Sequence, residues 1–417
     1  MKHGAEVHDI GAMLEGAEAP VSEKCCIYRV PFRIRKLNED AYTPMVVSVG
    51  PFHHNAHPGL HNMEKHKLLY CKAFLQRTKT TIDTWIHYLE EELSFIRSCY
   101  SETIDLVSKD ELVKIILVDS FFILELFCRF AEGEPLRNDV CLTKTWLFTH
   151  IQLDLLLLEN QLPFSLLDAL FNMSFSRSEG LPSFLQLTFE YFNDYNRSNM
   201  NSDNISISNF TDLLRTFNLK HPLHEQPHRI QEFVKHFPSA TELSEAGVRF
   251  KVNTEKKCLL DFKFAGGDLE IPQLEVHDWT ELLFRNMVAL EQCHYPEESY
   301  ITDYVKILDV LVNTSKDVDV LIRKRVLVNW LGDSDIVAKL FNGLMQNVTE
   351  SNVSSHFLSL RQELNDFYRN PWNNLKSTLK RDYCRTPWQT AATVAAIVLL
   401  ILSFVQAVCS VLQVLPH

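Results

Sequence analysis

The hydrophobic positions along the chain recur mainly with the spacing of an α-helix, about 3.6 residues per turn. Helical spacing runs through residues 62–97 and returns in a series of amphipathic segments over residues 278–349. Residues 112–130 and 146–164 are apolar on nearly every side. This predicts two buried helices at the centre of the fold, the second ending or kinking at Pro163. We therefore expect a mainly α fold with a large helical globular body.

Polar residues at fixed offsets mark where some of these helices begin. Ser108 is followed three residues later by Glu111, and Asp278 is followed in the same way by Glu281. This is the spacing of a capping box, in which a side chain accepts a hydrogen bond from a backbone N–H of the first turn. We expect one helix to begin after Ser108 and another after Asp278.

Two stretches of the body depart from the helical pattern. Residues 193–209 are dominated by asparagine, serine and aspartate, which predicts an exposed and mobile polar loop. Residues 247–272 alternate apolar and polar side chains with a period of two, and Gly266-Gly267 supplies a tight turn. We expect a small β-hairpin element at this position.

The pattern divides the chain into three parts. Residues 1–24 carry acids and glycines without an apolar core, so we expect a disordered tail and no secretory signal peptide. Residues 25–385 are expected to form one helical domain, which closes with a stalk helix over residues 353–385 that is kinked at Pro371. Residues 386–417 are expected to form a C-terminal anchor.

The anchor is predicted from an apolar run near the C-terminus. Residues 391–415, from Ala391 to Leu415, include no charged side chain, and a bilayer core of about 30 Å needs about 20 apolar helical residues. Thr386 and Pro387 suit the start of a helix, and Trp388 suits the membrane interface. We expect one transmembrane helix in contact with the lipid bilayer. We interpret Gln406, with Ser403 and Ser410, as bonding backbone carbonyls within this helix, and keep a homo-oligomer joined through Gln406 as the alternative.

The side of the membrane on which the body lies is indicated by two signals that disagree. Four basic residues precede the apolar run and favour a cytosolic body by the positive-inside rule: Lys376, Lys380, Arg381 and Arg385. Three N-x-S/T sequons in the polar loop favour an extracellular or lumenal, glycosylated body instead: Asn196, Asn204 and Asn209. We expect a cytosolic body at the plasma membrane or an endomembrane, with the outward-facing body as the alternative.

Composition narrows the classes of function. The formal net charge of −12 argues against general nucleic-acid binding, which needs a basic surface. The 10 cysteines include no C-x-x-C pair, so we expect buried, reduced thiols in keeping with a cytosolic body. Only 12 glycines are present, and no phosphate-binding loop motif occurs among them. We expect no cofactor.

One cluster of histidines is a candidate metal site, because zinc binds three or four converging nitrogen, sulfur or oxygen ligands. It contains His53, His54, His57, His61 and His66. Pro58 and Gly59 break the helical spacing within it, and no H-E-x-x-H motif or cysteine pair accompanies it. We interpret the cluster as a turn whose histidines form hydrogen bonds ahead of a helix, and keep a metal site as the alternative.

A second candidate is the polar group Asp154, Glu159 and Asn160, which interrupts an apolar segment. Paired carboxylates can perform acid–base chemistry when burial separates their pKa values. The chain offers no nucleophile or orienting base beside them. We therefore interpret Glu159, Asn160 and Gln161 as groups that satisfy backbone carbonyls at a helix end.

Several sequence blocks together resemble one plant family, known as domain of unknown function 247. The blocks are Ile27–Pro31, Ser48–His54, Met63–Lys67, Leu157–Phe164, Pro238–Val248, Asn286–Gln292 and Asp303-Tyr304. The resemblance runs from about Cys25 to the C-terminus and includes an apolar C-terminal segment. It implies a plant-specific, membrane-associated protein with no assigned reaction. Some members are encoded at the self-incompatibility loci of grasses, as candidate pollen-side recognition determinants. That role cannot be transferred to this chain, because most members of the family are encoded at other loci.

Three hypotheses on function follow. The first is a non-enzymatic, single-pass membrane protein that recognises an unidentified protein partner in recognition or signalling. The second is a membrane-tethered enzyme, metal-assisted through the cluster from His53 to His66. The third is a recognition protein that faces the cell exterior. Metal analysis separates the first two, and glycosidase treatment tests the third.

Overall fold

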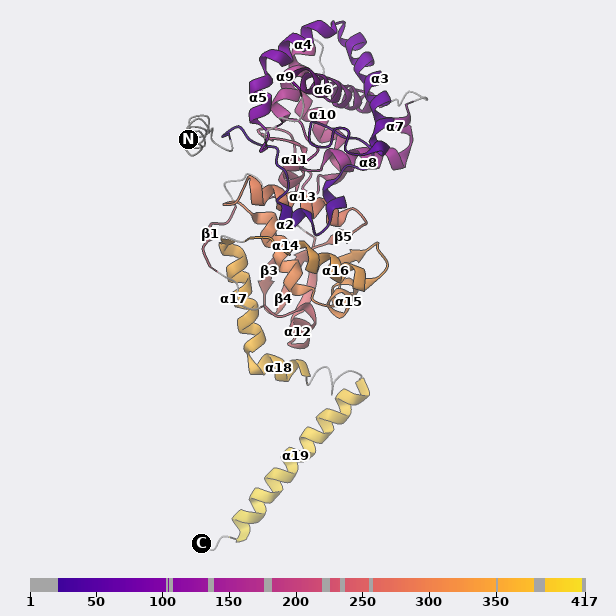
Figure 1. Ribbon diagram of the computed structural model, residues 1–417. Helices are drawn as coiled ribbons and strands as arrows, with labels where there is room; N and C mark the ends of the chain where they lie inside the picture. Colours follow the sequence, from indigo (N-terminus) through magenta and orange to yellow (C-terminus); the bar gives the residue numbers. More distant parts are fainter. Residues whose placement is uncertain are drawn as a thin grey trace, which may run out of the picture.

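The chain folds into two lobes, with one long helix beyond them (Figure 1). The computed structural model describes residues 22–102, 104, 108–133, 139–175, 182–219, 226–232, 237–254, 258–349, 352–378 and 387–414. Helices make up most of these residues and strands are few and short, which confirms the mainly α fold class.

The N-terminal lobe is a bundle of helices around one central helix. Its elements are α3 (His61–Thr78), α4 (Ile82–Glu91), α5 (Leu93–Ser98), α6 (Lys109–Ala131), α7 (Val140–Thr143), α8 (Thr145–Leu155), α9 (Phe164–Ser174), α10 (Phe184–Tyr191) and α11 (Phe210–Asn218). Helix α6 begins as predicted, with the Ser108 side chain accepting the Glu111 N–H at 3.2 Å. Phe121 and Phe127 of α6 are fully buried and pack against aromatic side chains of α3, α4 and α10. The prediction that α6 lies at the core is confirmed.

Two predicted helices of this lobe have different limits from those expected. The helical pattern of residues 62–97 is divided among α3, α4 and α5, because Lys79 takes a left-handed conformation with φ 54° and ends α3. Helix α8 ends at Leu155, well before Pro163, and Pro163 instead precedes α9. The prediction of a helix that continues to Pro163 is wrong. The intervening residues are buried without being helical, since side chains supply their hydrogen bonds.

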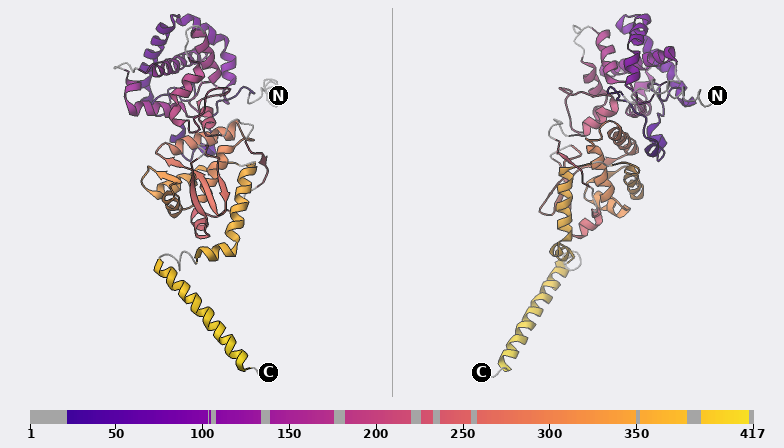
Figure 2. Two further views of the ribbon diagram at one scale, coloured as in Figure 1. Left: turned by 180° about the vertical axis from the view of Figure 1, so that it is seen from behind. Right: turned by 60° about the vertical axis from the view of Figure 1, so that its left-hand side comes forward.

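The C-terminal lobe combines helices with three small sheets (Figure 2). Its helices are α12 (Ala240–Glu245), α13 (Thr280–Cys293), α14 (Tyr300–Leu311), α15 (Ser315–Arg323), α16 (Ser334–Leu344), α17 (Ser355–Arg369) and α18 (Pro371–Thr378). Its strands are β1 (Arg229–Ile230), β2 (Arg249–Asn253), β3 (Lys263–Ala265), β4 (Asp268–Pro272), β5 (Leu274–Val276), β6 (Leu327–Asn329) and β7 (Val353–Ser354).

The predicted β-hairpin is present, and it belongs to a larger arrangement. Strands β3 and β4 form an antiparallel pair across the turn at Gly266-Gly267, both of which have positive φ. Strand β2 joins the same sheet parallel to β4, in the order β2-β4-β3, so it is no part of the hairpin. The pairs β5–β6 and β1–β7 lie outside the predicted element. These partners are distant in the sequence, and a local pattern does not show them.

The start of α13 differs from its prediction. The helix begins at Thr280, and its N-cap residue is Trp279 without a side-chain hydrogen bond. The Thr280 hydroxyl accepts the His277 N–H at 2.8 Å. Asp278 is therefore not the cap that its spacing from Glu281 predicts, because the chain turns one residue later.

The predicted stalk is a pair of helices packed against the body. Asn370 lies between α17 and α18, and Pro371 is the first residue of α18 rather than a kink within one helix. Leu360 and Leu364 of α17 are buried, and the Phe367 ring packs against Phe264 of β3. Residues 353–378 therefore complete the C-terminal lobe, and residues 379–385 of the predicted stalk lie outside the described part of the chain.

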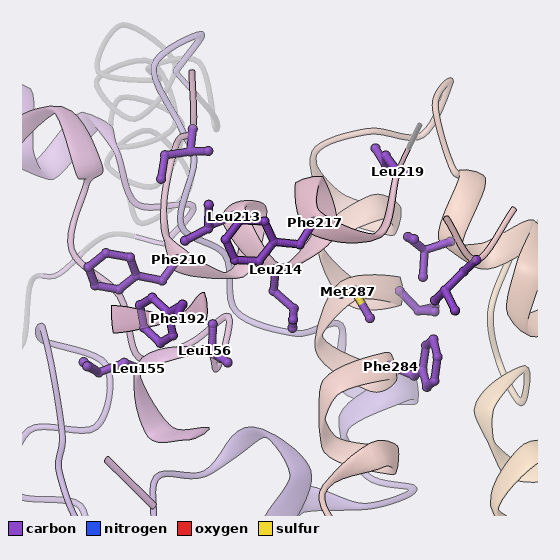
Figure 3. Close-up of a cluster of buried hydrophobic side chains, with 14 of the residues drawn as sticks. Leu155, Leu156, Phe192, Phe210, Leu213, Leu214, Phe217, Leu219, Phe284 and Met287 are labelled. Atoms are coloured by element: carbon purple, nitrogen blue, oxygen red, sulfur yellow. The ribbon is translucent and has the colours of Figure 1, made fainter. Parts of the chain in front are cut away.

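The two lobes share one hydrophobic core. Figure 3 shows their junction, where α11 packs on α13 and Leu214 of α11 lies toward Met287 of α13. The N-terminal segment, residues 25–54, crosses the same junction. It contains α2 (Phe32–Arg35) and the 3-10 turn η1 (Glu39–Tyr42), and η1 packs on α13. The lobes are therefore held together by apolar burial and by a segment that belongs to both.

Helix α19 (Pro387–Val414) lies beyond the two lobes (Figure 1). It begins at Pro387 as predicted, while Thr386 and the end of the predicted span, Leu415, lie outside the described residues. Its stretch Trp388–Ser410 is long and apolar enough to cross a membrane, and none of it is buried by the rest of the chain. Trp388 itself is 86% exposed.

Candidate functional site

Buried polar side chains of the body hold the N-terminal segment and the ends of neighbouring helices through hydrogen bonds. We call this set the frame, and it consists of Lys67, Asp119, Asp154, Glu159, Asn160, Gln161, Asn286 and Glu291. Glu159 is at its centre with a fully buried side chain. Its carboxylate accepts the Val30 N–H at 2.9 Å and an Arg29 guanidinium N–H at 3.1 Å. His53 Nε2 lies 3.2 Å and Arg35 Nε 3.6 Å from the same carboxylate. Glu159 thus binds groups of the N-terminal segment from several sides.

The protonation of Glu159 follows from these neighbours. Burial by itself raises the pKa of a carboxyl group. At Glu159, His53, the Val30 N–H and Arg35 outweigh the burial and hold the pKa below its usual value. The carboxylate is therefore ionised and fully engaged, as expected of a group that positions backbone, and it is not a poised general acid.

Asp154 and Asn160 hold the next part of the N-terminal segment. The Asp154 carboxylate accepts the N–H groups of Met45, Val46 and Val47 at 2.7–2.9 Å. Asn160 accepts the Val49 N–H at 2.6 Å and donates to the carbonyls of Val47 and Asp154. The amides of Asn160 and Gln161 satisfy backbone carbonyls, as interpreted from the sequence. The carboxylate of Glu159 does not, because it accepts a backbone N–H group and has no hydrogen to donate.

Gln161 and Gly50 complete this contact. The Gln161 amide donates to the carbonyls of Leu155 and Leu157, just after α8. Gly50 has φ 72°, and a Cβ added to it would lie 2.7 Å from the Gln161 carbonyl oxygen. Only glycine fits at this crossing without displacing the backbone.

A buried lysine anchors α3 to α6. Lys67 is fully buried, and its ammonium lies 2.7 Å from Asp119 and 2.6 Å from Glu64. The second Asp119 oxygen accepts the Gly50 N–H at 2.8 Å. These groups compensate one another's charge and join two helices to the N-terminal segment, as buried ion pairs must if they are not to destabilise the fold.

The C-terminal lobe has matching anchors on α13 and α14. Asn286 accepts the Leu158 N–H at 2.9 Å and donates to the Ala41 carbonyl at 2.7 Å. Glu291 accepts the N–H groups of Ile301 and Thr302 and the Arg215 guanidinium. In the residues described, these carboxylates and amides are engaged with backbone or with arginine. Such an arrangement fixes the positions of the segments that it joins.

The five histidines of the candidate metal cluster have different surroundings. His53 is buried beside Glu159, whereas His54 Nε2 lies 3.9 Å from Glu111. His61 Nδ1 lies 3.1 Å from the Pro58 carbonyl oxygen, as expected for a turn. His57 is exposed and His66 is half-buried. Within the part of the chain that the structure describes, no group of three or more His, Cys, Asp or Glu side chains is placed to hold a metal ion.

A cleft of about 720 Å³ lies between the lobes. Leu214 of α11, with Phe284 and Met287 of α13, lies on its apolar side. Its polar side is formed by Asp194, next to α10, and by Glu275 of β5. An apolar cavity with a few polar groups is the usual form of a binding site, and this cleft is the best candidate among the described residues.

Aromatic rings stack at one edge of the cleft. The His277 ring lies parallel to the Trp279 ring at a centroid distance of 4.8 Å and to the Trp330 ring at 5.7 Å. Glu275 orients the stack, because it accepts the Trp330 indole N–H at 3.0 Å and lies 3.3 Å from His277 Nε2. Trp330 is 63% exposed, so the stack offers a flat apolar surface to a partner.

The backbone of β5 also has an open edge. Leu274 donates to the Val326 carbonyl, and Val276 accepts the Trp330 N–H, so both residues face β6. In a strand, the N–H and C=O of the residue between them, Glu275, then face the opposite side. Neither of these groups has a hydrogen-bond partner among the described residues.

The predicted polar loop is not exposed throughout as expected, because two of its three sequon asparagines are buried and form hydrogen bonds. The Asn196 side chain is buried and bonds both backbone groups of Met200. Asn209 caps α11 by accepting the Asp212 N–H, and it donates to the Cys26 carbonyl at 2.7 Å. Asn204 is exposed. The folded structure therefore leaves Asn204 as the accessible acceptor of the three, and the use of any sequon stays a prediction.

The chain matches one protein family over most of its length. A family described as plant protein of unknown function, DUF247, matches residues 27–402. The chain belongs to this family. It is 27% identical to UPF0481 protein At3g47200 of Arabidopsis thaliana, over 95% of this chain and 88% of that protein. It is 23% identical to the putative UPF0481 protein At3g02645 of the same plant, over 91% of this chain and 89% of that protein. No solved structure matches the chain.

The DUF247 blocks in the sequence contain several residues of the buried frame and of the segment that it holds. Arg29, Gly50, Lys67, Glu159 and Asn286 each fall within one of them and each join distant segments. The resemblance was therefore carried by the residues that build the fold. The cleft was missed, because Glu275, His277 and Trp330 come together only through the pairing of β5 with β6. The one local signal was the alternation of apolar and polar residues over Leu274–Val276.

Proposed function

We propose that this DUF247 protein is a non-enzymatic, single-pass membrane protein whose cytosolic body recognises a partner protein through the interlobe cleft. The contrast between two apolar helices carries the proposal. Helix α6 is covered by the body on almost every side, whereas the described side chains of α19 from Trp388 to Ser410 are 0% buried. An apolar helix of this length left uncovered in water has a large free-energy cost, and a bilayer removes that cost.

The cytosolic orientation is supported by the basic residues before α19 and by the cysteines. Lys376, Lys380, Arg381 and Arg385 flank the anchor, and retention of basic flanks in the cytosol is the strongest general determinant of orientation. The cysteines of the described residues are free thiols, most of them buried, as is usual in a reducing compartment.

The cleft suits an extended segment of a partner protein. Glu275 offers an unpaired N–H and C=O at the edge of β5, which a peptide in strand conformation can pair with. The apolar side, with Leu214 and Met287, can receive alternate side chains of such a peptide. Trp330 adds an exposed aromatic surface beside it.

Anchoring is tested with the full chain and with a variant that ends before Pro387, both expressed in plant cells. The full chain should stay with membranes through a carbonate wash and the truncated chain should not. A body that withstands protease added to intact cytosol-exposed membranes, together with a mobility shift on glycosidase treatment that Asn204→Gln abolishes, would contradict the cytosolic orientation.

Recognition through the cleft is tested with a photo-crosslinking amino acid placed at Leu283, which lines the cleft, or at the exposed Trp146 as control. A partner should be captured from Leu283 only. Glu275→Pro removes the free N–H of β5, whereas Glu275→Ala removes the same side chain and keeps the N–H. Capture that survives equally in both variants would contradict pairing at the β5 edge.

A further inference from the structure

Helix α18 carries an exposed apolar face that has no partner among the described residues. Trp372 is 76% exposed and Leu375 is 59% exposed, and Lys376 beside them is exposed as well. With about 100° of rotation per residue, these three side chains fall within an arc of roughly 100° on one side of the helix. The face therefore combines a large amphipathic ring, an aliphatic side chain and a positive charge.

The opposite side of α18 is fixed to the body. The Asn373 side chain donates to the Phe367 carbonyl of α17 at 3.1 Å. At the other end, a Cβ added to Gly247, which follows α12, would lie 3.3 Å from the Ser377 Cβ, so the two segments are in close contact. Ser377 lies roughly 140° around the helix from Trp372. The exposed face thus has a definite orientation relative to the body.

The position of α18 in the chain indicates what covers this face. Residues 379–386 link it to α19 and can span at most about 30 Å when fully extended. The linker contains Lys380, Arg381 and Arg385. Figures 1 and 2 show α18 running across the end of the C-terminal lobe from which the chain leaves toward α19. A face tethered this closely to a membrane-spanning helix is held near the headgroups, where tryptophan and lysine are favoured.

We propose that α18 lies on the membrane surface, with Trp372 and Leu375 inserted at the headgroup level and Lys376 against lipid phosphates. This inference rests on the proposed anchoring by α19 and adds a second lipid contact to it. Because α18 is attached to both α17 and the segment after α12, the contact sets the orientation of the whole body. The C-terminal lobe then lies next to the bilayer and the N-terminal lobe is held away from it.

The test uses the full chain reconstituted in vesicles of phosphatidylcholine with phosphatidylserine. An environment-sensitive fluorescent amino acid replaces Leu375, or Trp388 as the membrane reference, or Trp146 of the N-terminal lobe as the aqueous reference. The emission at position 375 should shift to the blue and be quenched by bromine-labelled lipids as at position 388. The emission at position 146 should respond instead to iodide in the water.

The outcomes separate the two proposals. Vesicles that retain the protein through a carbonate wash, while position 375 behaves like position 146, overturn the membrane-surface helix and leave the anchoring by α19 intact. Loss of the protein in the wash overturns both. Shielding of position 375 that depends on protein concentration and not on lipid means that a second copy covers the face, and it also overturns the inference. In the supporting case, Trp372→Ser with Lys376→Ser should abolish the blue shift at position 375 while the protein remains in the vesicles.

Discussion

Single buried side chains in this protein each stabilise several backbone groups that come from distant parts of the chain. Asp154 accepts three N–H groups, and Glu159 and Asn160 each bind groups of the N-terminal segment. Removing one such partner leaves buried donors unsatisfied, which costs about 1–3 kcal/mol for each group. Substitution of a single one of these side chains is therefore expected to lower the stability of the fold strongly.

Gly50 provides a test of the close approach between the N-terminal segment and the Gln161 carbonyl. Gly50→Ala should destabilise the chain by more than about 1 kcal/mol, because φ is positive and the new Cβ would meet the Gln161 carbonyl at 2.7 Å. Gly59→Ala is the matched control, since nothing lies within 4 Å of a Cβ there. Thermal unfolding followed by circular dichroism measures both, and equal midpoints would contradict the predicted clash.

The pH dependence of stability tests the environment of Asp154. Burial raises its pKa to about 6, although the N–H groups of Met45, Val47 and Val46 act in the opposite direction. An unfolded aspartate has a pKa of about 3.9, so the folded chain binds a proton that the unfolded chain lacks between about pH 4 and pH 6. Stability from this group therefore falls as the pH rises through that window.

Asp154→Asn should remove this contribution, because an amide does not ionise. The melting temperature of the variant should decline less than that of the natural chain between pH 4 and pH 6. The difference between the two curves of melting temperature against pH isolates the contribution of Asp154 from that of Asp303. Burial also raises the pKa of Asp303 to about 6. Parallel curves would show that Asp154 is not buried as described.

At the scale of elements, the helices obey local patterns, whereas their ends depend on side chains elsewhere. Helix α6 begins where Ser108 predicts it, since a cap acts within one turn. Helix α8 ends early because Gln161, six residues after Leu155, binds that residue's carbonyl. Helix α11 is capped by Asn209, a residue whose sequence pattern predicted an exposed loop.

Asn209 tests the role of such a cap. Asn209→Ala should destabilise the chain by about 1–2 kcal/mol, because it removes the α11 cap and also the bond to the Cys26 carbonyl. Asn201→Ala, at an exposed asparagine of the same loop, should have little effect. Urea unfolding midpoints would measure the difference, and equal loss in both variants would contradict a special role for Asn209.

At the scale of the whole molecule, the two lobes are expected to unfold together. Their cores are continuous at the α11–α13 junction, and the N-terminal segment contributes to both. A protein joined in this way has few states in which one lobe is folded and the other is not. The interlobe cleft is consequently a stable feature on which recognition can depend.

Met287 at this junction tests the coupling. Met287→Ala should cost about 2–5 kcal/mol through the cavity it leaves, and amide exchange should quicken in both lobes. Met45→Ala is the control, since Met45 is 64% exposed. Faster exchange confined to the C-terminal lobe would show that the lobes unfold independently.

The features that depend on neighbouring residues follow from the local sequence pattern. Helical periodicity, the α6 cap at Ser108, the turn at Gly266-Gly267 and the apolar run of α19 all act over a few residues, and each was predicted at its place. The tertiary structure alone decided the parallel pairing of β2 with β4, the partners of Glu159, and the cleft beside Trp330. These depend on which distant segments meet. The packing of the whole core determines which segments meet, and a pattern of neighbouring residues does not contain that information.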